Sequence, residues 1–333
     1  MTLEKILSDL KKRNYKPVYW LEGEEEFFID QVIHYAEHNL LSENEAGFNL
    51  TIFYGRDCSW PDLINTCRKY PMFSDLQVVI LKEAQVMKDI EKLELYIEKP
   101  LVSTLFFVAY KGKKIDGRTK LAKLLKDRSV LLTTRKLYDN ELPGWISELI
   151  KSKGYSITSK ALVLLIDHIG NDLSRLNNEV DKLVLNLHNR KNITEDDIET
   201  FVGISKEFNV FELQQAIANK DLYKAIRIVQ YFEANPKAAP LQLIFPSLYN
   251  YFSKVQMIYS VPARDEKTVA SAIGVSPYFV RDYLQTAMKF SNQEVEKVLL
   301  LLHQYNLKKI GINDAGNDDA MLLKEMVVKM IAA

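Results

Sequence analysis

A buried strand and an unusual turn before it meet in Arg68-Lys69-Tyr70-Pro71-Met72-Phe73-Ser74-Asp75-Leu76-Gln77-Val78-Val79-Ile80-Leu81. The second half, residues 76–81, is a short apolar run rich in β-branched residues, which is typical of a buried parallel strand. In the first half, Pro71 prevents regular helix continuation, and two large apolar residues follow it directly. The stretch therefore predicts an apolar turn, closed by Ser74 and Asp75, that leads into a strand.

The two apolar residues of this turn, Met72 and Phe73, allow two interpretations. Composition favours packing of both side chains under the sheet, because large apolar residues are usually buried. The alternative is that they project from the turn as a wedge, the kind of anchor that fills an apolar pocket of a partner protein. Spacing alone leaves both interpretations open.

Strand-like and helix-like segments alternate through the first 140 residues. Further strands are predicted at residues 18–21, 50–54, 104–110 and 130–134, and helices at residues 3–13, 27–40, 59–70, 86–98 and 120–126. Alternating apolar strands and helices predict a parallel sheet with helices on both faces. We therefore expect residues 1–140 to form an α/β domain.

The first strand is followed by a glycine turn and a helix, which is the layout of a phosphate-binding loop. That loop requires Gly-Lys-Ser/Thr four residues after its first glycine. Counted from Gly23, the three positions hold Phe28, Ile29 and Asp30. Phosphoryl transfer needs a phosphate lysine and a metal clamp together, and here both are missing. The sequence predicts a degenerate loop without ATP or another cofactor.

One segment of the chain, residues 111–136, is strongly basic, with ten Lys or Arg against two Asp. It could face a nucleic-acid backbone or an acidic partner, and a solvated loop and helix face explains it equally well. The residues considered for such a contact are Lys111, Lys113, Lys114 and Arg118.

Length and composition limit the class of protein. A chain of 333 residues implies two or three domains, and its 44 basic and 44 acidic residues cancel, so no global field steers it to nucleic acid. Two cysteines make neither a disulfide framework nor a metal motif. The N-terminus does not resemble a signal peptide, and no apolar run approaches the length of a membrane span. We expect a cytoplasmic protein with no membrane contact.

Two further patterns resemble functional sites but favour a purely structural interpretation. His34 and His38 are four residues apart on one predicted helix, but without a third ligand an exposed helix face is favoured over a metal site. Residues 268–284 look like a helix-turn-helix with Gly274 in the turn. The second helix begins with apolar residues instead of base-reading Arg, Asn or Gln, which favours packing against protein. A DNA-binding or scaffold protein remains the alternative function.

From about Asp139 the pattern becomes helical, and no further strand is expected. Residues 141–208 predict a small helical lid, and residues 209–333 predict an all-helical domain in which prolines separate the helices.

Over essentially its full length, the chain resembles the delta subunit of the bacterial DNA polymerase III clamp loader. The resemblance rests on the order and spacing of several segments and on the missing ATP site. These segments are Pro17-Val-Tyr-Trp-Leu-Glu-Gly-Glu-Glu-Glu-Phe-Phe-Ile29, Tyr70-Pro-Met-Phe-Ser-Asp-Leu-Gln-Val-Val-Ile-Leu81, Ile273-Gly-Val-Ser-Pro-Tyr-Phe-Val280 and Leu307-Lys-Lys-Ile-Gly311.

The resemblance implies an AAA+-like α/β domain, a helical lid and an all-α C-terminal collar that joins other loader subunits, gamma/tau and delta prime. It implies a non-catalytic subunit of a DNA-directed DNA polymerase, without ATPase activity of its own. It also implies that the β sliding clamp is a partner, and that the chain meets primed DNA within the complex during DNA replication.

In the family, a hydrophobic pair at the tip before this strand inserts into a pocket of the clamp. The pair matches Met72 and Phe73, with Tyr70 and Pro71 directly before it. The family's pair is often Leu-Phe, and the flexible side chain of methionine suits the same pocket. A glutamine common near the start of such motifs is Arg68 here. The resemblance favours the wedge, which would hold one interface of the clamp open.

Overall fold

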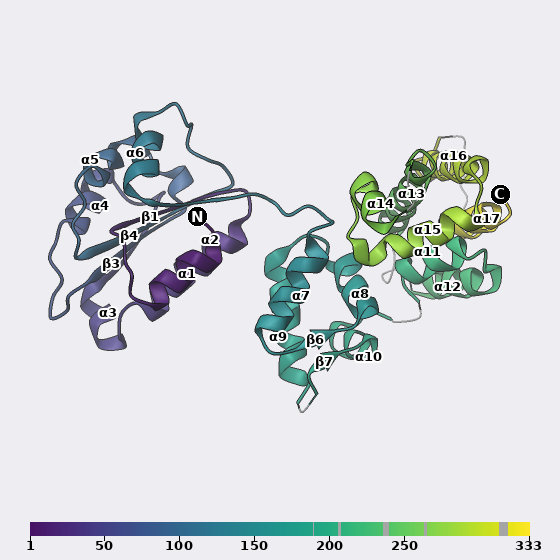
Figure 1. Cartoon of the computed structure of the whole chain (residues 1–333), viewed down its shortest axis with the longest axis horizontal. Helices are drawn as coiled ribbons and strands as arrows, with labels where there is room; N and C mark the ends of the chain where they lie inside the picture. Colours follow the sequence, from purple (N-terminus) through teal and green to yellow (C-terminus); the bar gives the residue numbers. More distant parts are fainter. Residues whose placement is uncertain (189, 206–207, 236–239, 263–264, 313–318) are drawn as a thin grey trace. The chain divides into compact units, whose positions relative to one another are not determined.

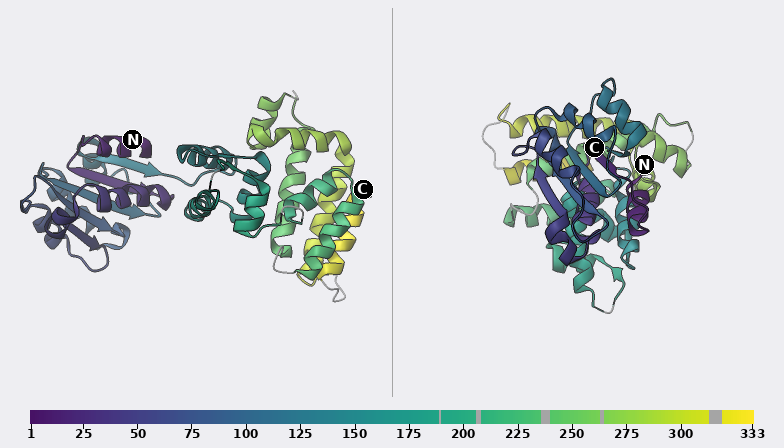
Figure 2. Two further views of the ribbon diagram at one scale, coloured as in Figure 1. Left: turned by 90° about the horizontal axis from the view of Figure 1, so that it is seen from below. Right: turned by 90° about the vertical axis from the view of Figure 1, so that its left-hand side faces the viewer.

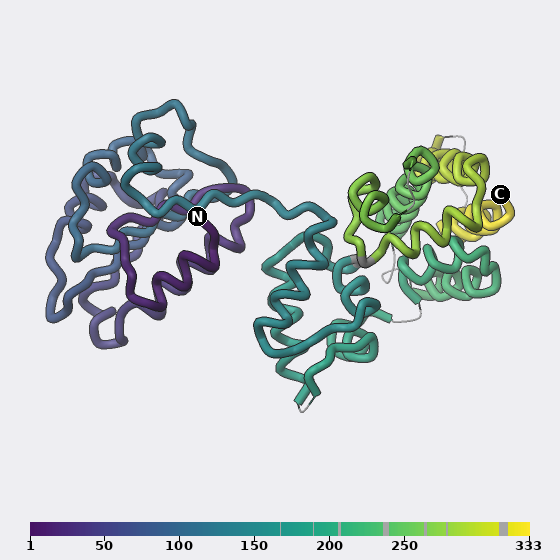
Figure 3. Tube along the Cα trace, in the orientation of Figure 1, coloured from purple at the N-terminus to yellow at the C-terminus, as the bar shows by residue number. Residues whose placement is uncertain are grey.

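The computed structural model describes residues 1–188, 190–205, 208–235, 240–262, 265–312 and 319–333. It divides into two compact units, Met1–Leu137 and Tyr138–Ala333, and the chain passes from the first to the second after Leu137 (Figure 3). The further division of the second unit into a lid, 141–208, and a collar, 209–333, stays a prediction.

A sheet of five parallel strands forms the centre of the first unit (Figure 1). Its strand order is β2-β3-β4-β1-β5, so β1, β3 and β4 are paired on both sides. Strands paired on both sides read as continuous apolar runs, as the sequence predicted. The strands are β1 (Val18–Gly23), β2 (Leu50–Tyr54), β3 (Gln77–Lys82), β4 (Thr104–Lys111) and β5 (Val130–Thr134).

Helices cover both faces of this sheet, which confirms the predicted α/β class (Figures 1 and 2). Successive side chains of a strand point to opposite faces, so Tyr19 and Leu21 pack against one set of helices and Val18 and Trp20 against the other. The first set is α1 (Leu3–Lys11) and α2 (Glu26–Asn39), and the second is α4 (Trp60–Cys67), α5 (Glu94–Ile97) and α6 (Lys120–Arg128).

One prediction for this unit was wrong, and one helix was not predicted. The helix expected over residues 86–98 is broken into η1 (Ala84–Val86), η2 (Ile90–Leu93) and α5, because Asp89 has a left-handed backbone with φ 53°. A short helix, α3 (Glu43–Asn49), was missed, although Ser42 and Glu45 form a capping box at its start.

The second unit is mainly helical, but the expectation that it holds no strand was wrong. Two short parallel strands, β6 (Ser156–Ile157) and β7 (Asn192–Ile193), pair with each other. The surrounding helices are α7 (Leu142–Ser152), α8 (Ser159–Ile169), α9 (Leu173–Asn186), α10 (Glu195–Asp197) and the π-helix η3 (Ile198–Val202).

The rest of the second unit packs its helices around a single apolar core. Within it, the helix-turn-helix-like segment consists of α14 (Glu266–Ile273), the left-handed Gly274 with φ 64°, η4 (Pro277–Phe279) and the start of α15 (Val280–Lys289). Val280 at the start of α15 is fully buried in this core. The helices are α11 (Val210–Ala218), α12 (Leu222–Ala234), α13 (Leu241–Ile258), α14 (Glu266–Ile273), η4 (Pro277–Phe279), α15 (Val280–Lys289), α16 (Asn292–Lys309) and α17 (Asp319–Ile331).

Candidate functional site

The turn between α4 and β3 presents large apolar side chains to solvent. Tyr70 is 77% exposed, Met72 is 54% exposed and Phe73 is 92% exposed, whereas Pro71 is partly buried. The rings of Tyr70 and Phe73 therefore contribute little to the core, and Met72 is half outside it. Exposed apolar residues grouped in one loop are characteristic of a contact surface for another molecule.

Phe73 also has a strained backbone. Its φ is 54°, in the left-handed region that is unfavourable for side chains other than glycine, asparagine and aspartate. Such a conformation persists only where the surrounding structure holds it, and strained residues of this kind are concentrated at functional sites. Because the ring is almost wholly exposed, burial does not offset this strain.

The short helix α3 holds the turn from one side. The side-chain amide of Asn49 makes two hydrogen bonds with the backbone of Met72: Oδ1 accepts from the N–H at 2.7 Å, and Nδ2 donates to the carbonyl at 2.9 Å. Ser74 Oγ donates to Glu45 Oε1 at 2.8 Å. Hydrogen bonds from Ser42 and Ser74 lower the pKa of Glu45 to about 2, so the carboxylate is charged at neutral pH.

A buried amide holds the turn from behind. Gln77 Nε2 lies 2.8 Å from the carbonyl oxygen of Lys69 and 2.7 Å from Thr104 Oγ1. Thr104 Oγ1 in turn donates to the carbonyl of Cys67 at 2.9 Å, at the end of α4. These bonds fix the backbone on which Tyr70 to Phe73 stand, so exposed apolar side chains are carried by a rigid support.

The opposite, carboxyl end of the sheet contains the degenerate phosphate-binding loop. Gly23 has φ 129°, and a Cβ on it would lie 2.1 Å from the carbonyl oxygen of Thr134. Of the three positions that replace Gly-Lys-Ser/Thr, Phe28 is partly buried, Ile29 is fully buried and Asp30 is exposed. A buried isoleucine cannot supply the cation that this position gives a triphosphate.

The N-terminus of α2 is occupied by a carboxylate of the chain itself. Glu25 Oε1 accepts a hydrogen bond from the N–H of Phe27 at 3.3 Å, which caps the helix. Lys136 Nζ lies 3.2 Å from Glu25 Oε2, an ion pair without hydrogen-bond alignment, since that oxygen has no hydrogen-bond partner among the described residues. Where nucleotide-binding proteins place phosphate at a helix N-terminus, this chain has placed Glu25.

Two of the four basic candidates are paired within the chain. Lys111 Nζ lies 2.6 Å from Asp30 Oδ1, and Arg118 Nη2 lies 2.6 Å from Asp116 Oδ2. Lys113 Nζ lies 5.6 Å above the ring centroid of Tyr110, and Lys114 is exposed. The acidic face of α2 thus neutralises Lys111, which makes Lys113 and Lys114 the better candidates for an external contact.

Two models of one protein family match the two parts of this chain. "DNA polymerase III, delta subunit" matches residues 19–135, and "DNA polymerase III delta subunit, C-terminal domain" matches residues 207–330. This chain belongs to the DNA polymerase III delta subunit family. The resemblance inferred from the sequence is confirmed, and the chain is a component of the DNA polymerase III clamp loader.

Delta-family relatives match most of the chain. The DNA polymerase III subunit delta of Bacillus subtilis is 24% identical over 334 residues, covering 96% of this chain and 94% of the relative. The probable DNA polymerase III subunit delta of Aquifex aeolicus is 23% identical over 298 residues, covering 85% and 83%. The solved Bacillus subtilis DNA clamp loader delta protein has a TM-score of 0.56 at 23% identity, with full coverage of both chains. This structural likeness confirms the fold, a parallel sheet with helices followed by a largely helical C-terminal region.

The histidine pair of this delta-family chain lies on an exposed helix face. The rings of His34 and His38 are 4.4 Å apart, and His38 Nδ1 lies 3.0 Å from the carbonyl oxygen of His34. In the part of the chain that the structure describes, no three His, Cys, Asp or Glu residues are grouped to hold a metal ion. Within the same part, no helix is long and apolar enough to cross a membrane.

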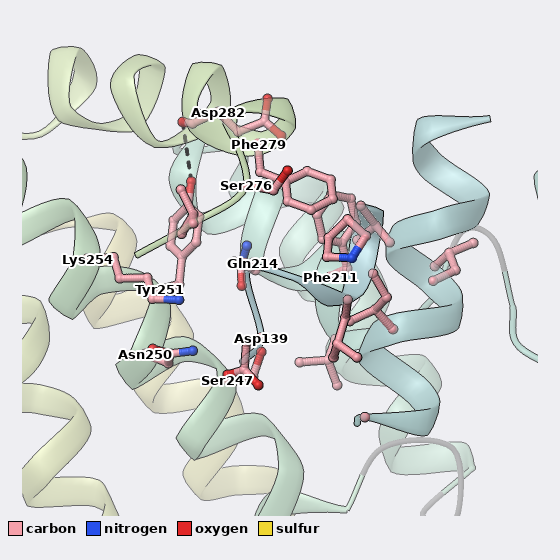
Figure 4. Close-up of a pocket in the computed structure, with 18 of the residues that line it drawn as sticks. Asp139, Phe211, Gln214, Ser247, Asn250, Tyr251, Lys254, Ser276, Phe279 and Asp282 are labelled. Carbon is pink, nitrogen blue, oxygen red and sulfur yellow. Dashed lines mark hydrogen bonds between the residues drawn. The ribbon is translucent and has the colours of Figure 1, made fainter. Parts of the chain in front are cut away.

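Sequence reasoning missed a cavity of about 530 Å³ in the second unit. Figure 4 shows the side chains of Gln214 and Lys254 beside Tyr251, whose hydroxyl donates to the carbonyl of Asp282 at 3.4 Å. Burial lowers the pKa of Lys254 and raises the pKa of Asp282. The cavity is lined by one lysine, carboxylates, amides and apolar groups from segments far apart in the sequence. No local sequence pattern therefore pointed to this cavity.

Proposed function

We propose that this chain binds the β sliding clamp of DNA replication through the turn before β3, with Met72 and Phe73 as the inserted pair and Tyr70 and Pro71 beside them. The exposure of these apolar residues is the observation that carries the proposal. In a protein interface, such residues gain on binding the apolar burial that folding did not give them.

The rigid support of the turn strengthens the proposal. Asn49 holds the backbone of Met72, and Gln77 holds the backbone of Lys69 ahead of the pair, before any partner arrives. A surface that is already ordered loses less conformational entropy on binding, and more of the contact free energy appears as affinity. The left-handed backbone conformation of Phe73 is consistent with this explanation, since the strained conformation sets the position of its ring.

Clamp opening follows from differential affinity. A ligand that binds the open ring better than the closed ring shifts the equilibrium towards the open ring by that difference. In this proposal Met72 and Phe73 stabilise a clamp with one interface open, and the open clamp is then loaded on primed DNA. ATP acts on partner subunits and uncovers the pair, while this chain hydrolyses no ATP.

The helical second unit has a separate role in the proposal. Its C-terminal collar, residues 209–333, joins the gamma/tau and delta prime subunits in a ring, and residues 141–208 form the lid. The proposed site of action is the cytoplasm. Lys113 and Lys114 are proposed to meet DNA or a neighbouring subunit.

The decisive experiment is nucleotide-free binding of the purified chain to its own clamp, by calorimetry or surface plasmon resonance. Met72→Ala/Phe73→Ala should weaken binding by at least about 100-fold, because hot-spot truncations each cost about 2 kcal/mol or more. The matched control is Tyr54→Ala/Val86→Ala, which removes two exposed apolar side chains of the same unit and should leave the affinity unchanged. Circular dichroism checks that both variants fold.

Three results would count against the proposal. Failure of the intact chain to bind the clamp would leave an assembly scaffold, and specific binding of duplex DNA by the chain alone would favour the helix-turn-helix alternative. Unfolding of the Met72→Ala/Phe73→Ala variant would return these side chains to the core.

A further inference from the structure

A second exposed aromatic ring stands beside Phe73. Phe48, in the last turn of α3, is 67% exposed. Its ring centroid lies 6.4 Å from that of Phe73, and the two planes make an angle of 76°. This is the edge-to-face arrangement that aromatic pairs prefer. The two rings come from positions 25 residues apart in the sequence, so no local pattern relates them.

The helix that carries the Phe48 ring is held by the same bonds that hold the turn. Phe48 directly precedes Asn49, whose side chain makes both hydrogen bonds to the backbone of Met72. The capping box of Ser42 and Glu45 stabilises the start of α3, and Glu45 also accepts from Ser74. Helix α3 and the turn therefore form one rigid piece that carries Phe48, Met72 and Phe73.

We propose that Phe48 is a direct contact residue for the sliding clamp, so that the clamp-binding surface joins two segments, the turn before β3 and the last turn of α3. This inference rests on the proposed function. The partner surface must be apolar beyond the part that receives Met72 and Phe73, because the exposed Phe48 ring extends the same apolar surface without a charged group between the rings.

The closeness of the Phe48 and Phe73 rings favours the clamp over any other binding partner of Phe48. A ring 6.4 Å from Phe73 cannot stay clear of a protein that encloses Phe73, since typical interfaces extend over 20–30 residues on each side. An aromatic residue next to a buried anchor is a hot-spot position, and hot spots cluster near the centre of an interface. Phe48 also sets the direction of approach, because two rings on a rigid support define an orientation that one ring does not.

The test measures clamp affinity for wild type, Phe48→Ala and the control Tyr54→Ala. Tyr54 is matched to Phe48: it is an exposed aromatic at the other end of β2. Phe48→Ala should weaken clamp binding about 10-fold or more, mainly through faster dissociation, as expected for a buried contact. Phe48→Leu should keep much of the affinity. Hydrogen exchange of the backbone amides of residues 68–70 and 72–76 in the free chain should be the same in wild type and Phe48→Ala.

Each possible outcome either supports or overturns direct contact between Phe48 and the clamp. Weaker binding with unchanged exchange supports direct contact. Binding equal to wild type overturns the role of Phe48, while the Met72→Ala/Phe73→Ala variant still reports on the proposed function. Weaker binding with faster exchange of the turn also overturns direct contact, since Phe48 would then act only by holding Phe73. Failure of wild type to bind rejects the proposed function and this inference with it.

Discussion

The two ends of the parallel sheet differ in how their side chains are used. At the amino end, Phe48, Tyr70, Met72 and Phe73 are exposed apolar residues on a backbone held by hydrogen bonds. At the carboxyl end, Glu25, Asp30, Lys111 and Lys136 pair with one another or with the backbone. Ligands of open α/β sheets usually bind at the carboxyl end.

Under the proposed function, this difference separates partner recognition from the site of nucleotide binding within one domain. The carboxyl end keeps the shape of a phosphate-binding loop, but its charges are satisfied internally. In the proposed function, the amino end supplies the free energy of clamp binding through apolar side chains. Changes at the carboxyl end should therefore affect stability, and changes at the amino end should affect clamp binding.

The largest effect is expected for Gly23→Ala at the carboxyl end. The new Cβ would lie 2.1 Å from Thr134 O, at a φ of 129°. Strain and overlap together should lower the free energy of unfolding by about 3 kcal/mol or more. Chemical denaturation measures this loss. The control is Gly117→Ala, because a Cβ there meets nothing within 4 Å, and it should unfold like wild type. Equal stability of both variants would mean that β1 does not approach β5 as described.

A smaller effect of opposite sign is expected for Phe73→Gly at the amino end. Glycine relieves the left-handed strain, which is worth about 1–2 kcal/mol, while the more flexible unfolded chain offsets about half of it. The free energy of unfolding should rise slightly, although clamp binding is lost. Met72→Gly is the comparison, since Met72 is not among the described residues with positive φ and gains no such relief. Equal losses of stability in both variants would contradict backbone strain at Phe73.

The smallest effect is a change in one titration. The pKa of Glu45 is lowered to about 2 by hydrogen bonds from Ser42 and Ser74. A folded pKa below the unfolded one gives stability above about pH 4.5, which is lost as the pH falls towards 2. In Ser74→Ala the pKa of Glu45 should rise towards its ordinary value, as followed by carboxyl ¹³C NMR. The pKa of Glu294, also about 2 but held by Lys220 and Ser291, should stay unchanged. An unchanged pKa of Glu45 would show that the hydrogen bond from Ser74 does not lower it.

Much of the fold could be predicted because the strands are short, mainly apolar runs rich in β-branched residues. Leu50–Tyr54 and Val130–Thr134 have the predicted limits, and the other three strands differ by one or two residues. The missed elements are those that local pattern describes poorly. Helix α3 contains Gly47 and ends in Asn49, yet Ser42 and Glu45 gave a capping signal that could have revealed it. The break at Asp89 depends on a backbone conformation that hydrophobic spacing does not report.

The candidate site could be predicted only in part. The residues Met72 and Phe73 were found from the turn and the family resemblance, but composition favoured their burial, and only the structure gives their exposure. Phe48 could not be found, because its relation to Phe73 exists only after β2 and β3 pair. The pairing of Lys111 with Asp30 likewise joins residues that are 81 positions apart.

The carboxylate of Glu25 at the start of α2 has a consequence for the order of events in time. A phosphate that caps a helix arrives and departs with each round of nucleotide binding and hydrolysis, whereas a side chain of the same polypeptide is always present. This helix end therefore has the same charge and the same partner through an entire loading cycle. If the proposed function holds, any periodic change in clamp binding is imposed from outside, by neighbouring subunits that cover and uncover Met72 and Phe73.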